Sequence, residues 1–407
     1  MNKKALAEAL SQAYDNPYSD FYRALYASRG FLLPADTPHD QVEWSTIPLL
    51  SKEDIASTPL EKRIFVPKED VLFYRTSTGT SNRGVVIIPR NLVRDLPTRT
   101  AHATRMLEFL APHHFSHFSA EHSGTLSIAG DRSDLPATAR LAARFAADGI
   151  SATPTILAAL IPELEKQLDL AKIRYLYLWG ERISHTKRAL LYEKFPNAYI
   201  EYDYALSELH GVGGAGCEKM IRAKEFFVHP HSDLIYWELV DPQTGAVVED
   251  EGEIVITTLW ANNAFPGIRY RTGDLARRVE FPCDCGREAY EILGRSAYDR
   301  ALLPGGMVTS AELERSLALY RDLIEDDFEL HIFDIDSAPR LELHIRTKEG
   351  VALTPAVVAA HMAESLSLSP HHTLQDQIRA GLVAELKCVL LPAGLVRKDK
   401  QIRIVTH

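Results

Sequence analysis

A short apolar run at residues 173–180, IRYLYLWG, constrains the fold of this chain more than any other stretch. It is almost continuously apolar and ends in a glycine, which is the pattern of a strand buried on both faces of a parallel sheet. Helical spacing of apolar residues precedes it at 137–148 and 155–168, although Pro162 must bend or break the second helix. A further strand candidate follows at 198–206. Strands that alternate with helices predict an α/β sheet.

The character of the sequence changes near residue 293, and we place a domain boundary there. Before it, residues 3–30 and the Ser-capped 51–57 are predicted helices, and the turn DPQTG joins LIYWELV to EGEIVITTL as a hairpin. After it, the pattern predicts a helix at 310–320, a hairpin through FELHIFDID and RLELHIRTK, a helix at 354–366 and a closing strand. The expected domains are residues 1–293 and 294–407.

Charge and composition limit the partners. The net charge of −10 argues against general nucleic-acid or anionic-membrane binding, because both need concentrated lysine and arginine. The sequence contains no run of about 18 uninterrupted apolar residues, so no membrane span is predicted. The polar N-terminal segment does not resemble a signal-peptide core. A cytoplasmic location is therefore expected. Four cysteines in 407 residues do not make a disulfide scaffold, so a clustered pair indicates metal binding or chemistry.

The segment 74–90, YRTSTGTSNRGVVIIPR, is rich in serine, threonine and glycine. Such a loop presents backbone N–H groups and hydroxyls that can surround phosphate oxygens. Gly79 and Gly84 have the gap of a Walker A loop, but Val85 and Val86 stand where its lysine and hydroxyl residue belong. A P-loop kinase or GTPase is therefore not expected. From its residues alone, the segment is either an anion cradle or a plain surface loop.

Five further segments follow in a fixed order: YLWGERIS, YALSELHG, YRTGDLARR, ILGRSAYDR and RKDKQIRIV. In this order they resemble the adenylate-forming superfamily of acyl-CoA synthetases. FPCDCGREAYEILGRS and HPHSDLIYWELVDPQTG are similar to the phenylacetate–CoA ligase-like branch. The match is continuous from about 170 to 314, with support at 76–84 and 397–405, and is loose over the first 70 residues and 100–150. The resemblance implies a large N-terminal α/β adenylation domain, with mixed sheets and helices, and a small mobile α+β C-terminal domain.

The resemblance also implies a reaction. ATP would activate a carboxylic acid as acyl-AMP, and the acyl group would pass to a thiol, most simply that of CoA. Two anions must approach each other in the first step, so the site must neutralise charge and align the reactants. The implied cofactors are ATP, Mg²⁺ and CoA. A small-molecule carboxylic acid, with an aromatic acid as one candidate, is the expected partner.

The first implied site is the loop around the triphosphate. The resemblance assigns this role to a run of small residues, namely Ser77, Thr78, Gly79, Thr80 and Ser81. The chain departs from the common pattern at Asn82, where glycine is usual, and at Val85, where many relatives have lysine.

Tyr204, Ser207 and Glu208 fall on the family motif Tyr-Gly-Leu-(Ser/Thr)-Glu, with Ala205 in place of the glycine. The resemblance implies that Tyr204 lies against the adenine, that Ser207 faces the α-phosphate, and that Glu208 holds Mg²⁺. A carboxylate is the hard oxygen ligand that this ion prefers, normally shared with nucleotide phosphates. From the residues alone, a solvated loop carboxylate is the alternative role for Glu208.

Four more residues belong to the implied nucleotide pocket or its edge. Gly180 and Glu181 match the family's Gly-Glu segment, and Trp179 before them is either part of the pocket or a core aromatic. Asp274, in a predicted Thr-Gly-Asp turn, would accept hydrogen bonds from both ribose hydroxyls, which a neutral side chain cannot do. Arg295, at the domain junction, would reach the ribose or a phosphate.

Lys400 matches the family's catalytic lysine when the tail is aligned through KQIRIV, with Lys398 nearby. An ammonium on a long stem is a mobile point charge that can bridge the carboxylate and the α-phosphate. Asp299 falls near the family's hinge acid, but one extra residue between Gly294 and Gly305 leaves that register open. The small domain would swing about this hinge between the two half-reactions.

Cys283 and Cys285 form a Cys-X-Cys turn, and Cys217 lies upstream. In the branch that the chain resembles, some members carry zinc on such cysteines and on a histidine, here His229. Three thiolates and one imidazole would complete a closed tetrahedral structural site. His231 is the alternative ligand, and free surface thiols beside a buried Cys217 are the alternative to zinc.

Other functions stay open. Adenylation can end on a carrier-protein pantetheine, an amine, or Cys388, since related acyl-protein synthetases use a C-terminal cysteine; otherwise Cys388 is a buried strand residue. AMP transfer of the coenzyme F390 synthetase type resembles the same branch. A non-catalytic nucleotide-binding protein is favoured by the two departures in the phosphate loop. The retention of Asp274, Glu208 and Lys400 disfavours it.

The acid and the assembly are not encoded in any motif. Residues 113–124, HHFSHFSAEHSG, either line an aromatic-acid pocket or form a polar loop. A carrier protein and a second copy of the chain are the open partners.

Overall fold

The computed structural model describes residues 3–33, 38–76, 86–91, 102–109, 125–209, 211, 213–295, 300–303, 306–333, 338–369, 372–392 and 403–407. Several predicted functional residues lie outside this part of the chain, namely Ser77, Thr78, Gly79, Thr80, Ser81, Asn82, Val85, residues 113–124, Asp299, Lys398 and Lys400. The chain divides into two compact units. The first comprises Met1–Thr153, Lys172–Gly180 and Asn197–Ile292, and the second Pro154–Ala171, Glu181–Pro196 and Leu293–His407. The domain boundary at residue 293 stays a prediction.

A seven-stranded sheet forms one layer of the first unit, in the order β4-β3-β5-β6-β7-β8-β9. Its strands are β3 (Arg105–Glu108), β4 (Leu126–Ala129), β5 (Gly149–Ala152), β6 (Tyr175–Trp179), β7 (Tyr199–Tyr204), β8 (Gly214–Ala215) and β9 (His229–Pro230). The pairs from β4 to β7 are parallel, and β8 and β9 are antiparallel additions. The predicted strands at 173–180 and 198–206 are therefore confirmed as β6 and β7.

The helices of this unit are α1 (Lys3–Tyr14), α2 (Phe21–Ser28), α3 (Lys52–Ser57), α5 (Leu135–Phe145) and the short α8 (Glu218–Arg222). The stretch predicted at 3–30 forms two helices, α1 and α2, the predictions at 51–57 and 137–148 are confirmed as α3 and α5, and α8 was not predicted. Ser51 begins α3 with a reciprocal capping box to Asp54. Asp134 begins α5, because its side chain accepts a hydrogen bond from the Ala137 N–H.

A second sheet of the first unit has the order β11-β10-β12-β13-β14. Its strands are β10 (Ile235–Val240), β11 (Val247–Val248), β12 (Glu251–Thr258), β13 (Tyr270–Val279) and β14 (Ala289–Arg295). The predicted hairpin around DPQTG is confirmed as the antiparallel pair β10–β12. A separate hairpin, β1 (Phe73–Thr76) with β2 (Ile87–Arg90), pairs Thr76 with Ile87. The segment between these strands therefore joins two adjacent strand ends.

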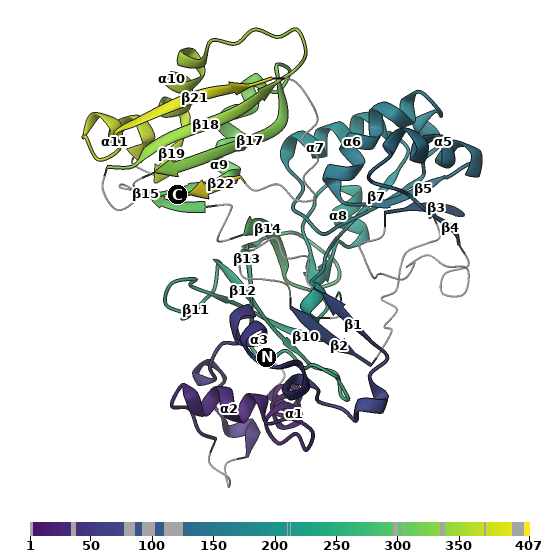
Figure 1. Cartoon of the computed structure of the whole chain (residues 1–407), viewed down its shortest axis with the longest axis vertical. Coiled ribbons are helices and arrows are strands. Elements are labelled where there is room, and N and C mark those ends of the chain that lie inside the picture. The colour runs from purple at the N-terminus through teal and green to yellow at the C-terminus, as the bar shows by residue number, and fades with distance from the viewer. Residues whose placement is uncertain are drawn as a thin grey trace. The chain divides into compact units, whose positions relative to one another are not determined.

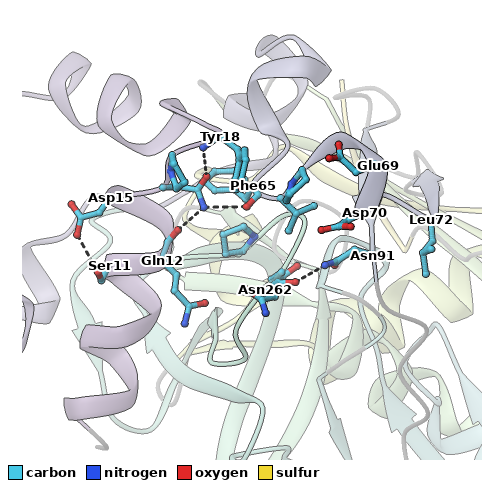
Figure 2. Close-up of a pocket in the computed structure, with 16 residues that line it drawn as sticks. Ser11, Gln12, Asp15, Tyr18, Phe65, Glu69, Asp70, Leu72, Asn91 and Asn262 are labelled. Atoms are coloured by element: carbon cyan, nitrogen blue, oxygen red, sulfur yellow. Dashed lines mark hydrogen bonds between the residues drawn. The ribbon is translucent and has the colours of Figure 1, made fainter.

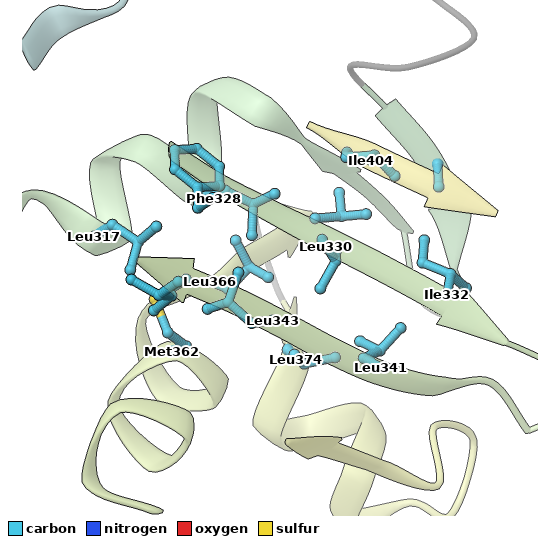
Figure 3. Packing of buried hydrophobic residues seen from close by; sticks show 14 of the residues in the cluster. Leu317, Phe328, Leu330, Ile332, Leu341, Leu343, Met362, Leu366, Leu374 and Ile404 are labelled. Atoms are coloured by element: carbon cyan, nitrogen blue, oxygen red, sulfur yellow. The ribbon is translucent and has the colours of Figure 1, made fainter. Parts of the chain in front are cut away.

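The second unit contains a four-stranded sheet in the order β21-β18-β17-β22 (Figure 1). These strands are β17 (Ile324–Phe333), β18 (Arg340–Thr347), β21 (Glu385–Leu391) and β22 (Ile404–Thr406), with short pairs β15 (Arg300–Leu303) and β16 (Gly306–Thr309), and β19 (Ser367–Ser369) and β20 (His372–Thr373). Helices α9 (Ser310–Leu317), α10 (Pro355–Ser365) and α11 (Leu374–Arg379) accompany them. One face of the sheet, with Leu330 and Leu343, packs with Met362 and Leu374 into a single apolar core (Figure 3). The tail pattern predicted this hairpin, α9, α10 and the closing strand, but not α11.

Helices α6 (Pro154–Glu165) and α7 (His185–Lys194) also belong to the second unit. Pro162 lies inside α6, so it does not break the helix, which was one of the two expected outcomes. The ring removes one backbone donor within the last turn, and the helix ends at Glu165. In the described part of the chain, no helix is long and apolar enough to cross a membrane.

Candidate functional site

Tyr204 and Asp274, 70 residues apart in the chain, are in contact in the first unit. The Tyr204 hydroxyl donates a hydrogen bond of 2.7 Å to Asp274 Oδ2, and both side chains are buried. Tyr204 is the last residue of β7, whereas Asp274 lies in β13. The contact therefore joins the end of one sheet to the other sheet, and it brings together two residues that the sequence assigned to one nucleotide site.

Asp274 lies in a bulged strand rather than in a separate turn, which corrects the expected Thr-Gly-Asp turn. Between the pairs Glu253–Leu275 and Val255–Arg271, β12 has one residue and β13 has three. Residues 272–274 therefore bulge, with two more residues than the opposite strand, and Gly273 adopts a φ of +76° that favours glycine. The Gly273 N–H donates to Glu253 Oε1 at 3.1 Å, which holds the bulge against β12.

Ser207 and Glu208 follow β7 in a short 3₁₀ helix, η7 (Ser207–Leu209). The Glu208 carboxylate is almost fully buried, and Lys52 Nζ lies 3.5 Å from its Oε1. The buried Arg90 of β2 donates a hydrogen bond to the Ser207 carbonyl oxygen. Mg²⁺ is usually bound by one or two carboxylates together with phosphate oxygens, so the Glu208 carboxylate fits as a ligand of this ion. In this structure the Lys52 ammonium forms an ion pair with that carboxylate.

Sequence reasoning missed Arg90, Lys52 and Gly213. A Cβ added to Gly213 would lie 2.2 Å from the Tyr204 carbonyl oxygen, so only glycine fits beside the end of β7. Arg90 directly follows the apolar residues IIP of β2 and is nevertheless buried. An arginine at the end of an apolar strand was the sequence feature that could have indicated a buried, partnered charge. Lys52, the first residue of α3, lies 156 positions from Glu208, and no local pattern states such a partner.

Gly180 and Glu181 follow β6. Gly180 has a φ of +84°, which explains the glycine at the end of the apolar run. The Glu181 carboxylate accepts a hydrogen bond from the Thr155 N–H in the first turn of α6, where a negative charge favours the helix. Arg295 ends β14 and is half-buried. Roles for Gly180, Glu181 and Arg295 at the nucleotide stay predictions.

The predicted zinc ligands converge in the first unit. Cys217, His229, Cys283 and Cys285 place four ligand atoms within 4.8 Å of one another. The closest sulfur and nitrogen atoms are 2.7 to 3.3 Å apart, and a tetrahedral zinc ion bound at about 2.0–2.3 Å needs ligands roughly 3.5 Å apart. His231, the alternative ligand, is not part of this group.

The histidine and one thiol are prepared for such an ion. His229 Nδ1 lies 2.7 Å from the Glu288 carbonyl oxygen, so that nitrogen carries the proton and Nε2 faces the sulfur atoms. Burial raises the pKa of the Cys285 thiol, but contacts with Cys283 and Arg287 outweigh it and bring the pKa to about 7. The four residues therefore fit a closed structural site.

Cys388 has a different environment. It lies in β21, paired with Leu343 of β18, and packs against the core of the second unit. Burial raises the pKa of this thiol to about 11. The thiolate is the nucleophile in acyl transfer. This position therefore disfavours Cys388 as an acyl acceptor.

A separate hollow of about 860 Å³ lies in the first unit, beside α1 (Figure 2). Carboxylates and amides line much of it, including Asp15, Asn16, Glu69, Asp70 and Asn91. None of the predicted site residues is among its lining residues.

The chain is similar in sequence to several curated proteins. It is 26% identical over 363 residues to the phenylacetate-coenzyme A ligase of Pseudomonas putida, with 84% of this chain and 80% of that protein covered. The enzyme of the same name from Escherichia coli K12 is 26% identical over 345 residues, at 79% and 76% coverage. No family model matches the chain.

Solved structures share the fold. A 2-hydroxyisobutyryl-CoA ligase in its postadenylation state, with 2-HIB-AMP, has a TM-score of 0.72 at 17% identity, with 100% of this chain and 88% of that chain covered. The O-succinylbenzoate coenzyme A synthetase of Bacillus subtilis, with ATP and magnesium, has a TM-score of 0.53 at 16% identity and 78% and 66% coverage. The predicted resemblance and α/β fold class are confirmed. The relatives are CoA ligases, the class of enzyme that the motifs predicted.

Proposed function

We propose that this chain is an ATP-dependent carboxylate–CoA ligase. It adenylates a carboxylic acid at the end of β7 and passes the acyl group to the thiol of CoA. The contact between Tyr204 and Asp274 carries the proposal, because it unites two motif residues, 70 positions apart, that the resemblance assigns to one nucleotide. The similarity to phenylacetate-coenzyme A ligases over most of both chains supports it.

The described residues have the chemistry that binding ATP requires. The Asp274 carboxylate accepts hydrogen bonds from ribose hydroxyls, and the bond from Tyr204 fixes its orientation. Ser207 and Glu208 follow Tyr204 and face the phosphates, with Arg90 fixing the Ser207 backbone. Mg²⁺ bound at Glu208 would neutralise phosphate charge. Ser77, Thr78, Gly79, Thr80 and Ser81 are proposed to surround the triphosphate.

The reaction has two steps. A carboxylate oxygen attacks the α-phosphorus of ATP, the bond from that phosphorus to the bridging oxygen breaks, and pyrophosphate leaves. Lys400 is proposed to sit between the two anions during this step. The CoA thiol then loses its proton and attacks the acyl carbonyl, a thioester forms, and AMP leaves.

ATP–pyrophosphate exchange tests the first step, with pooled aryl, short-chain and long-chain acids. Exchange should require an acid. Asp274→Ala should lower kcat/KM for ATP by about 10²-fold or more, since two charge-assisted hydrogen bonds contribute about 1.5–3 kcal/mol each. Lys400→Ala should abolish exchange, whereas Lys398→Ala, two residues away, should retain it.

The outcomes separate the alternatives. ATP binding without exchange from any pool would indicate either AMP transfer to a cofactor that the assay lacks or a non-catalytic nucleotide binder. Mass spectrometry of products then identifies the acceptor: a CoA thioester supports the proposal. If the intact protein gains the mass of one acyl group, and the Cys388→Ser variant gains it too, the acyl acceptor is another residue of this chain. An acylated carrier protein would replace CoA as the acceptor.

We also propose that Cys217, His229, Cys283 and Cys285 hold a structural zinc ion. The four ligand atoms come from three segments, so the ion would fix β9 and the Cys-X-Cys turn to the start of α8. When bound, the ion would supply structure and no open coordination position.

Elemental analysis of the purified protein tests this site. One zinc ion per chain is expected, together with a lower melting temperature after chelation. Cys283→Ser should lose the metal, and Cys388→Ser, a thiol outside the group, should keep it. Full retention of the metal in Cys283→Ser would contradict the proposal. So would purified wild-type protein that contains no metal and whose melting temperature does not change when a chelator is added.

A further inference from the structure

One face of the parallel sheet in the first unit is polar although it is buried. Strand register places Glu108, Ser151, Tyr177 and Glu201 in one row across β3, β5, β6 and β7. Each is at most 9% exposed. The opposite face carries apolar residues such as Leu107, Ile150 and Leu176, because successive side chains in a strand alternate. Parallel sheets buried on both faces are usually apolar on both, so this row is unusual.

Asp203 and Trp179 form the next row of the same face, at the end of the sheet where β6 and β7 finish. The Tyr177 hydroxyl donates to Asp203 Oδ2 at 2.7 Å, and the Tyr175 hydroxyl donates to Glu201 at 2.8 Å. Burial and the adjacent carboxylates raise the pKa of both phenols, which therefore remain donors. These donors are neutral phenols, so each satisfies one oxygen of its carboxyl group without itself supplying a positive charge.

The position of Asp203 relates it to the proposed reaction. It directly precedes Tyr204, so its side chain lies on the face opposite the tyrosine that is assigned to the nucleotide. Ser207 and Glu208, assigned to the α-phosphate, follow a few residues later. Ligands of such sheets bind outside the carboxyl ends of the strands. An acid joined to the α-phosphate can extend away from the nucleotide along the face of Asp203.

We propose that Asp203, Tyr177 and Trp179 select the acyl part of the substrate, and that this acid is aromatic and carries an amino or hydroxyl substituent that donates to Asp203. The inference rests on the proposed ligase function and names its substrate class. The ring packs beside the aromatic side chains of Trp179 and Tyr177. A second carboxylate on the acid is excluded, because an ionised carboxylate has no proton to donate to Asp203.

Wild-type specificity gives the first test. ATP–pyrophosphate exchange is measured with benzoic and phenylacetic acids that carry an amino, hydroxyl, methyl or carboxyl group at each ring position. At least one amino or hydroxyl acid should have a kcat/KM about 10²-fold above that of its methyl counterpart, because a site built to accept a hydrogen bond rejects an analogue without the donor. The carboxyl series should be the poorest.

Two variants assign that preference to Asp203. Asp203→Val should reverse it in favour of the methyl acid, and the isosteric Asp203→Asn should reduce it about tenfold or more while keeping the shape of the site. Glu201→Gln is the matched control: it removes a buried carboxylate from the same face, one row further from the strand end, and should keep the preference. Calorimetric binding of ATP shows that each variant is folded.

The outcomes also separate this inference from the function beneath it. Exchange with methyl or unsubstituted acids as good as with the donor-bearing acids would overturn the inference and leave the ligase function standing. A preference that survives in Asp203→Val would overturn it as well. Absence of exchange with every acid would overturn both.

Discussion

Replacement of Arg269 by methionine should destabilise the first unit and loosen the strand that carries Asp274. Arg269 is 1% exposed and stands just before β13. Its guanidinium donates to the carbonyl oxygens of Ser45 and Ile47 at 2.8 and 2.6 Å. It also donates to both carboxylate oxygens of Glu238 at 3.2 Å. One side chain therefore fixes an N-terminal segment and β10 to the start of β13.

The expected loss in unfolding free energy is about 3–5 kcal/mol, the usual cost of removing one partner from a buried ion pair. For a unit of this size, each kcal/mol lowers the melting temperature by about 2–4 °C, so a decrease of roughly 10 °C is expected. Methionine is long and unbranched like the arginine stem, so the substitution leaves only a small cavity and little additional destabilisation. Most of the loss comes from leaving the Glu238 charge buried without its cation.

The loss should depend on pH. Burial raises the pKa of Glu238 above its usual value even though Arg269 and the Trp44 indole oppose it, and removing Arg269 raises it further. Because the folded-state pKa lies above the unfolded value, this group's contribution is fully present below the unfolded pKa and is lost as the pH rises through the folded pKa. The unfolding free energy of the variant should therefore be lowest near pH 8 and rise toward pH 5.

Urea denaturation at both pH values, followed by tryptophan fluorescence, measures this effect. A double variant, Arg269→Met with Glu238→Gln, should regain more than half of the loss at pH 8, because no unpaired charge remains. A loss below about 1 kcal/mol, or one that is equal at both pH values in the single variant, would refute the reasoning from the buried pair.

Two further predictions concern the end of β7 and the second unit. Gly213→Ala should weaken ATP binding in calorimetry about tenfold or more, because its Cβ would displace Tyr204, and Gly216→Ala, whose nearest contact is 3.5 Å, should bind normally. Burial raises the pKa of Asp326, but Arg403, 3.1 Å away, and other donors outweigh it and lower the pKa, so its contribution is present above the unfolded pKa and lost as the pH falls through the folded pKa. Asp326→Asn should therefore cost about 3 kcal/mol at pH 7 and less at acid pH, as measured by urea denaturation.

The strands and helices were largely predictable because their signals are local. The apolar run that ends at Gly180 is β6, and its glycine is explained by a positive φ. Asp274 shows where local reasoning fails. Its three letters indicate a turn, whereas the extra residues of the bulge appear only when β13 is set in register against β12. At Pro162 the local rule overestimates the damage to the helix. A proline in the last turn removes only one backbone donor, and α6 continues to Glu165.

The site was predictable where a family motif marks it and not elsewhere. Tyr204 and Asp274 were assigned to one nucleotide, and the fold brings them to 2.7 Å. Arg90 contacts Ser207 from 117 positions away, and no local pattern states such a partner. The polar face that includes Asp203 was missed because its residues belong to four strands. Each strand alone contributes one polar letter or two, and only the parallel register aligns them.

The account rests on the attack of a carboxylate oxygen on the α-phosphorus of ATP, and oxygen-18 transfer tests this step most directly. The enzyme is given ATP, CoA and an accepted acid whose carboxylate carries the heavy isotope, and the products are weighed by mass spectrometry. The account predicts AMP with one heavy oxygen, unlabelled pyrophosphate and a CoA thioester. Unlabelled AMP, or label in phosphate released with ADP, would contradict it.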